Sequence, residues 1–182
     1  MADVTYLEAL RQGLWEEMDR DPRVFILGED VGAYGGAFKV TEGFTKKFGE
    51  ARLAREGKDL SIVTYGATVW KSLEAADQLA KDDGLAVEVL DLRTLLPMDD
   101  AAIMRTVQKT NKVLIVHEDT RTGGLAGEIA ARINEQAFPW LDGPIMRVTA
   151  HDVPLPYAPT LEDFVLPQTE DIVKAARWLA AY

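Results

Sequence analysis

Residues 51–182 alternate between short apolar runs and longer amphipathic stretches, and this alternation constrains the fold more than any other feature of the sequence. The apolar runs predict strands at residues 51–55, 60–65, 86–91, 112–117 and 145–149. The amphipathic stretches predict helices at residues 69–81, 99–109, 125–137 and 168–181. Strands that alternate with helices of roughly 10–15 residues are typical of βαβ units, whose helices cover both faces of a parallel sheet. We therefore expect an α/β fold, namely a three-layer α/β/α domain with a mostly parallel sheet.

Two details of this domain depend on its connections. The first two expected strands are separated only by a charged turn at residues 56–59. Strands joined by so short a turn normally pair as a hairpin, so we expect the first strand to run antiparallel to the second. Before the last helix, Pro154, Pro156 and Pro159 predict a long loop.

Residues 1–50 follow a different pattern. They predict a helix at residues 4–19, a buried strand at 24–27 and a short helix up to residue 48 that Thr41 caps. One strand cannot form a sheet alone. The segment therefore docks on the other domain, borrows a sheet from a partner, or lacks a part that normally follows residue 50.

The composition excludes several classes of function. The formal net charge is −10, from 20 basic and 30 acidic residues, and such a surface repels nucleic acid and anionic lipid. The absence of cysteine excludes disulfides, thiolate metal sites and cysteine nucleophiles. No apolar run is long enough to cross a membrane. The first ten residues include Asp3 and Glu8 and no apolar core, so we expect neither a signal nor a transit peptide, and a cytoplasmic location.

A glycine-rich turn precedes the expected helix at residues 125–137. Gly124 and Gly127 match the last two positions of a dinucleotide-binding G-x-G-x-x-G pattern, but Thr122 occupies the first. The turn is therefore either an incomplete nucleotide site or a tight turn that packs closely against its neighbours. The second interpretation needs fewer assumptions.

Polar residues follow two of the expected strands, where α/β proteins place their sites. His117, Glu118 and Asp119 follow one strand, and Glu29 and Asp30 follow another. The histidine with its acidic neighbours suits acid–base chemistry or a metal, although adjacent side chains alternate in direction and cannot all reach one ion. A structural or interface role is the simpler interpretation of that group. The carboxylate of Glu29 either binds a cofactor nitrogen or caps a turn. The residues alone do not compose a complete active site.

Several segments form a combination that is specific when they are taken together. They are RVFILGEDVG at 23–32, YGGAFKVT at 34–41, GKDLSIVTYG at 57–66, VLDLRTLLPMD at 89–99, HED at 117–119, TGG at 122–124 and DVPLPYA at 152–158. In this order they resemble the beta subunit of thiamine-diphosphate-dependent 2-oxoacid dehydrogenases, a group that includes the pyruvate and branched-chain types. The resemblance implies that residues 51–182 form a domain like the C-terminal domain of transketolase.

One departure from that family is large. Between Glu50 and Ala51 the family carries most of the domain that binds the cofactor pyrimidine, including a D-T-P-x-x-E segment and a histidine-bearing loop. Neither occurs here. The resemblance therefore implies that residues 1–50 are a remnant of that domain, and that the principal catalytic residues of the family have no counterpart in this chain.

The resemblance also implies a reaction and partners. Family members decarboxylate a 2-oxoacid on thiamine diphosphate and then acylate a lipoyl group, and an alpha subunit holds the magnesium and the diphosphate. Glu29 matches an acidic residue that lies near the cofactor. Asp142 and the carboxylate of Tyr182 match positions that contact the basic binding domain of the lipoyl acyltransferase core.

These implications lead to two expectations. The first is a shortened beta subunit that is inactive alone and pairs with an alpha subunit. The second is a non-catalytic assembly module that binds an alpha subunit or the acyltransferase core. In either case, edge strands together with Leu14, Trp15, Phe25 and Phe44 predict an apolar patch and self-association.

Overall fold

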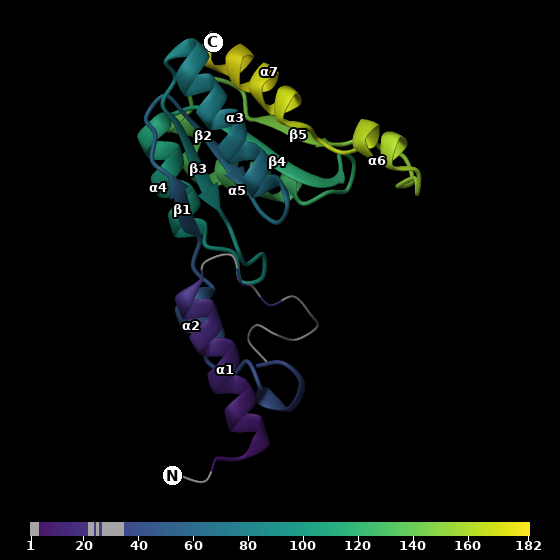
Figure 1. Cartoon of the computed structure of the whole chain (residues 1–182). Coiled ribbons are helices and arrows are strands. Elements are labelled where there is room, and N and C mark those ends of the chain that lie inside the picture. The colour runs from purple at the N-terminus through teal and green to yellow at the C-terminus, as the bar shows by residue number, and fades with distance from the viewer. Residues whose placement is uncertain (1–3, 22–23, 25, 27–34) are drawn as a thin grey trace. The chain divides into compact units, whose positions relative to one another are not determined.

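A computed structural model describes residues 4–21, 24, 26 and 35–182 of the chain (Figure 1). The chain divides into two compact units. One comprises Met1–Glu50 with Arg93–Asp99, and the other comprises Ala51–Leu92 with Asp100–Tyr182. Each unit is described here by itself.

The larger unit is an α/β domain built on a five-stranded sheet. The strands are β1 (Arg52–Arg55), β2 (Leu60–Thr64), β3 (Val87–Asp91), β4 (Val113–Thr120) and β5 (Met146–Ala150). The helices are α3 (Thr68–Asp83), α4 (Asp100–Thr110), α5 (Ala126–Ala137), the 3-10 turn η2 (Phe138–Trp140), α6 (Pro159–Val165) and α7 (Thr169–Ala180). The strand order is β1-β3-β2-β4-β5, and every neighbouring pair except β1–β3 is parallel. The predicted mostly parallel sheet is confirmed.

Helices cover both faces of this sheet, as Figure 1 shows. Alternate residues of β2, β3 and β4 pack with α3 and α7 in one apolar cluster, in which Ile62, Leu79 and Leu179 are fully buried. The other face lies against α4, where Ser61 of β2 reaches Thr106 and Thr110. All five residues of β2 are buried because the strand is central and covered on both sides, which explains why its sequence is a continuous apolar run.

The predicted hairpin is wrong, although the antiparallel direction of the first strand is right. β1 pairs with β3, with Arg52 opposite Asp91, and β2 lies on the far side of β3. The reason lies in the turn at residues 56–59, which is bound to the start of β3 instead of reversing beside β2. The N–H groups of Lys58 and Asp59 donate to the Ala86 carbonyl at 2.8 and 3.1 Å, and the Asp59 carboxylate accepts from the Ala86 N–H at 2.7 Å.

A buried polar network lies between β3 and α4. The Glu88 side chain is 3% exposed and accepts hydrogen bonds from the Thr106 hydroxyl, the Lys109 ammonium at 2.5 Å and the Gly57 N–H at 3.4 Å. The Lys109 side chain is 40% exposed, and its ammonium group is directed at the buried Glu88 carboxylate. The bond to Glu88 is the first cause of a raised pKa for Lys109.

The predicted proline-rich loop before the last helix contains a helix that the sequence pattern missed. Pro159 occupies the first turn of α6, where its missing N–H costs nothing and its fixed φ suits a helix. The prolines that predicted a loop therefore include a helix-start signal.

The smaller unit contains α1 (Tyr6–Arg20), the 3-10 turn η1 (Ala37–Lys39) and α2 (Phe44–Phe48). The predicted first helix is confirmed, and Thr5 and Glu8 form a capping box at its start. The predicted Thr41 cap is wrong, because α2 begins at Phe44 and its N-cap is Gly43, two residues later, in a left-handed conformation. Of the predicted strand at residues 24–27, Val24 and Ile26 are described and are not in a strand, and residues 25 and 27 lie outside the described residues.

The described part of this unit does not show the expected apolar patch. Phe44 is only 4% exposed, and the Trp15 ring meets it edge-on at 5.1 Å. Met18 and Phe48 complete a small cluster against which Leu14 packs. These side chains therefore bury one another, and Phe25, which also belonged to the expected patch, lies outside the described residues.

Candidate functional site

The strand order places a switch point between β2 and β4, because the helices that follow these two strands lead to opposite sides of the sheet. Crevices at such points are where α/β proteins bind ligands. In this chain Tyr65 directly follows β2, and His117 lies in β4 one residue beyond the last pair of the two strands, Thr64 and Val116. Their rings stack with centroids 5.7 Å apart and planes 14° apart.

His117 is fully buried beneath Tyr65. The Asp119 N–H points at Nδ1 at 3.0 Å and the Ala126 N–H points at Nε2 at 3.1 Å. A neutral imidazole has one unprotonated nitrogen, so it can accept from only one of these donors, and a doubly protonated ring could accept from neither. Burial, together with Arg147, lowers the pKa of His117, while Asp119 acts in the opposite direction. The ring is thus held neutral.

The glycine turn after β4 fits around this imidazole. A Cβ on Gly124 would overlap the Thr120 carbonyl oxygen and lie 2.8 Å from His117 Cε1, whereas a Cβ on Gly127 would meet only the end of the Arg147 side chain, at 3.9 Å. The first N–H of α5, from Ala126, is directed at His117. The interpretation as a tight, closely packed turn agrees with these contacts, and the N–H that a phosphate would use faces a side chain of the same chain.

The predicted acid–base group is thus separated by the fold. His117 faces the interior, whereas Glu118 and Asp119 are exposed. Burial raises the pKa of Tyr65 to about 12, and Asp119 and Glu118 contribute to that rise. A neutral buried imidazole beside a phenol that stays protonated serves packing and hydrogen bonding, which supports the structural interpretation.

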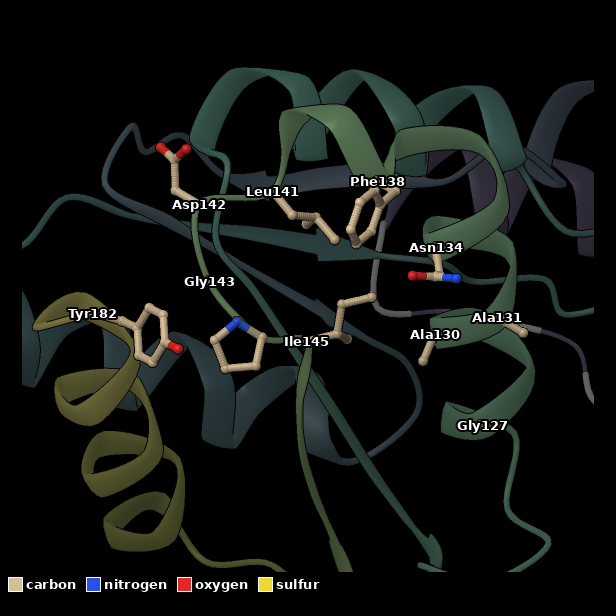
Figure 2. Close-up of a pocket in the computed structure, with 11 residues that line it drawn as sticks. Gly127, Ala130, Ala131, Asn134, Phe138, Leu141, Asp142, Gly143, Ile145 and Tyr182 are labelled. Carbon is tan, nitrogen blue, oxygen red and sulfur yellow. The ribbon is translucent and has the colours of Figure 1, made fainter.

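The second candidate site is a groove of about 780 Å³ that runs along α5, from Gly127 in its first turn to the residues that follow its last turn. It contains both residues predicted to bind a partner, Asp142 and Tyr182. Figure 2 shows these two at one end of the groove and Asn134 and Ala131 of α5 at the other. The full lining is Gly127, Ala130, Ala131, Asn134, Phe138, Leu141, Asp142, Gly143, Pro144, Ile145 and Tyr182.

Local hydrogen bonds fix the acidic end of this groove. The Asp142 N–H donates to the Asn111 carbonyl at 2.8 Å, and the Asn111 side chain donates to the Trp140 carbonyl at 2.6 Å. A Cβ on Gly143 would lie 3.3 Å from Tyr182 Cδ1, so this glycine lets the last residue approach closely. The exposed Asp142 carboxylate and Tyr182 thus lie close together at one end of the groove.

Sequence reasoning identified the acidic end of the groove and missed its other wall. The available signal was the spacing of Gly127, Ala130, Ala131 and Asn134, which recur at i, i+3, i+4 and i+7 along one helix face. Glu29, the predicted cofactor-binding residue, lies outside the described residues.

Neither a metal site nor a membrane span is found in the described part of the chain. Among residues 4–21, 24, 26 and 35–182, no three histidine or acidic side chains are grouped to hold a metal ion. None of the helices described is both long and apolar enough to cross a membrane.

A search of protein families matches residues 49–172 to the transketolase C-terminal domain. The chain belongs to this family. The match spans the five-stranded domain and includes the His117 turn and Asp142, and it confirms the transketolase-like domain expected from the resemblance.

Curated relatives over most of the chain are beta subunits. The chain is 43% identical over 180 residues to the mitochondrial pyruvate dehydrogenase E1 component subunit beta of Saccharomyces cerevisiae, which covers 96% of this chain and 49% of the relative. It is 40% identical over 161 residues to the corresponding subunit of Bacillus subtilis, covering 87% and 48%. It is 41% identical over 160 residues to the beta subunit of an acetoin:2,6-dichlorophenolindophenol oxidoreductase of Cupriavidus necator, covering 87% and 46%. The chain spans about half the length of these relatives.

Solved structures agree with the fold. A split-gene transketolase, described as an inactive beta4 tetramer, superposes with a TM-score of 0.63 at 28% identity and covers 73% of this chain and 42% of that one. A 2-oxoglutarate:ferredoxin oxidoreductase from Magnetococcus marinus gives a TM-score of 0.53 at 19% identity, covering 79% and 22%. The second likeness concerns the fold alone.

Proposed function

We propose that this chain serves as a beta-type subunit of a thiamine-diphosphate-dependent 2-oxoacid dehydrogenase. The observation that carries the proposal is a transketolase C-terminal domain whose curated relatives, at about 40% identity over most of the chain, are E1 beta subunits. The whole reaction decarboxylates a 2-oxoacid and transfers the acyl group to a lipoyl group. Because one relative is the beta subunit of an acetoin:2,6-dichlorophenolindophenol oxidoreductase, we do not propose one particular substrate.

The cofactor chemistry is assigned to a partner. Bound thiamine diphosphate supplies the carbanion that attacks a 2-oxoacid, and its diphosphate is held through magnesium. The described residues do not fit that role, since no group of three acidic or histidine side chains is present among them. We assign magnesium and diphosphate to an alpha subunit, and to Glu29 a contact with the cofactor. The chain alone is then inactive, in keeping with the inactive beta4 description of its structural relative.

The division of the chain supports this role. Residues 51–182 contain all five strands of the sheet and the helices that cover it. The described part of residues 1–50 contains only α1, η1 and α2. We interpret residues 51–182 as the transketolase-like domain and residues 1–50 as a remnant of the pyrimidine-binding domain. Separately, we propose that the protein is located in the cytoplasm.

The groove at Asp142 and Tyr182 is proposed to bind the lipoyl acyltransferase core. Its exposed carboxylate, its chain terminus and its apolar floor suit a basic partner segment that also carries apolar side chains. The net charge of −10 favours association with such a partner.

A second candidate, a non-catalytic assembly module, is favoured by one observation. The groove lies wholly within the larger compact unit, so docking through it requires none of the residues 1–50. In this case the chain binds an alpha subunit or the acyltransferase core without contributing to catalysis.

The deciding experiment is an assay of pyruvate decarboxylation with 2,6-dichlorophenolindophenol as electron acceptor. The chain is assayed alone and with an alpha subunit, each with thiamine diphosphate and magnesium. Activity only in the mixture supports the subunit role. Activity of the chain alone contradicts the proposed division of the site, and activity in neither case, despite formation of a complex, favours the assembly module. Calorimetric titration of thiamine diphosphate into the same two samples separates cofactor binding from turnover.

A further inference from the structure

Residues 153–164, called here the arm, expose several large apolar side chains to solvent. Figure 1 shows α6, which ends the arm, projecting beyond the helices that cover the sheet. The exposed fractions are 48% for Val153, 56% for Leu155, 103% for Tyr157, 55% for Leu161 and 74% for Phe164. Contiguous exposed apolar side chains of this size mark interaction surfaces in soluble proteins.

The arm is held in place at its two ends. At its start, the Asp152 carboxylate accepts hydrogen bonds from the Thr122 N–H at 2.8 Å and the Thr122 hydroxyl at 2.7 Å. At its end, the Gln168 side chain donates to the Asp163 carbonyl at 2.7 Å. A surface that is ordered before binding loses less conformational entropy when it binds, so it can contribute more to affinity.

The two large, exposed apolar residues of α6 lie on one face of the helix. Leu161 and Phe164 are three residues apart, a spacing that places side chains side by side. His151, at the base of the arm, stacks on Phe164 at 5.4 Å and donates its N–H to the Val165 carbonyl at 3.1 Å. The Phe164 ring is thus oriented by its own chain while most of its surface stays accessible.

The charge of the arm indicates what kind of chain covers it. The arm itself contains no lysine or arginine and two carboxylates, Glu162 and Asp163, and three further carboxylates, Asp152, Glu170 and Asp171, lie close to it in sequence. A second copy of this chain would bring the same carboxylates, and a net charge of −10, against them. Electrostatic complementarity therefore favours a different, basic partner surface.

We infer that the arm docks into an apolar groove with a basic rim on the alpha-type partner subunit. The inference rests on the proposed function, because it names the surface through which that partner is bound. Tyr157 and Phe164 are the anchor residues, since aromatic side chains dominate the energetics of such interfaces. Glu162 and Asp163 contribute mainly to the rate of association, because they face the basic rim.

The test measures binding of the full chain to a purified alpha subunit by surface-immobilised kinetics. Tyr157→Ser/Phe164→Ser is expected to raise the dissociation constant about 30-fold or more. Glu162→Gln/Asp163→Gln is expected to lower the association rate about tenfold at low salt, with a smaller effect at high salt. The control is Leu53→Thr/Trp70→Ser, which removes two exposed apolar side chains elsewhere, 44% and 52% exposed, and should bind as the wild type does.

The outcomes separate this inference from the proposed function. If the wild type binds and the Tyr157/Phe164 variant binds equally well, the arm is not the docking surface and the subunit role stands. If the wild type binds no alpha subunit, both are overturned. Sedimentation velocity of the chain alone tests whether a second copy of this chain covers the arm instead. If the wild type self-associates and the arm variant is monomeric, the arm binds a second copy and the inference is wrong. Unfolding curves of all variants should nearly coincide, because none of the substituted side chains belongs to the buried apolar core.

Discussion

Replacing Lys109 by methionine tests whether the buried Glu88 network stabilises the larger unit. Methionine keeps most of the stem that packs on the surface and removes the cation that lies 2.5 Å from the carboxylate. Removing one partner of a fully buried ion pair costs about 3–5 kcal/mol. Here Lys109 is 40% exposed, and Glu88 keeps the Thr106 hydroxyl and the Gly57 N–H as donors. We therefore expect a loss of about 2–3 kcal/mol, below the range for a fully buried pair.

The assay is urea unfolding and thermal unfolding, both followed by far-ultraviolet circular dichroism. The thermal midpoint of Lys109→Met should fall by about 5–10 °C for a chain of this length. Glu88→Gln, which keeps the shape and loses the charge, should cost about 1–2 kcal/mol. The double variant should cost less than the sum of the two, because one interaction is lost in both. Because the pKa of Lys109 is raised above its ordinary 10.5, this stabilisation is complete below that pH and is lost as the pH rises through the raised value. A loss under about 0.5 kcal/mol, or strict additivity, would refute the argument.

Three further predictions concern the two candidate sites. Gly124→Ala should lower stability by about 2 kcal/mol or more, because its Cβ would overlap the Thr120 carbonyl, while Gly127→Ala, whose Cβ would make only an ordinary contact with Arg147, serves as the control in the same unfolding assay. The pKa of His117 is lowered in the folded state, so unfolding free energy should decrease as the pH falls below its ordinary 6.5, and His117→Phe should remove this dependence; an unchanged pH profile would contradict the assignment. Asp142→Lys should weaken binding to the acyltransferase core about tenfold or more without changing stability, whereas Glu74→Lys, outside the groove, should not; calorimetric titration with the isolated core distinguishes them.

The sequence predicted the larger unit well where local pattern and burial agree. β2 is a continuous apolar run because it is covered on both faces, and α5 and α7 show apolar residues at helical spacing. The sequence pattern did not predict which strands pair over long sequence distances, and it missed one helix. The choice of β3 as the neighbour of β1 depends on hydrogen bonds from residues 58 and 59 to Ala86, which leave no local signal. α6 was missed because its starting proline is also a loop signal.

The candidate sites were predictable only in part. Asp142 and Tyr182 came from a family resemblance, and the structure places both in one groove whose other wall could have been found from helical spacing. The role of His117 could not be derived, because neutrality depends on burial and on two backbone N–H groups from residues 119 and 126. The arm could not be derived either, since its exposure results from the absence of contacts with distant residues.

The pairing of β1 with β3 also affects how the chain forms during synthesis. β1 ends at Arg55, but the strand that satisfies its backbone is complete only at Asp91. At roughly 5–20 residues per second, a ribosome leaves β1 without its neighbour for a time on the order of seconds. During that interval β2 also lacks both of its neighbours, so the first half of the sheet cannot stabilise itself. The larger unit therefore gains its order late, when β4 emerges and the central strands can pair together.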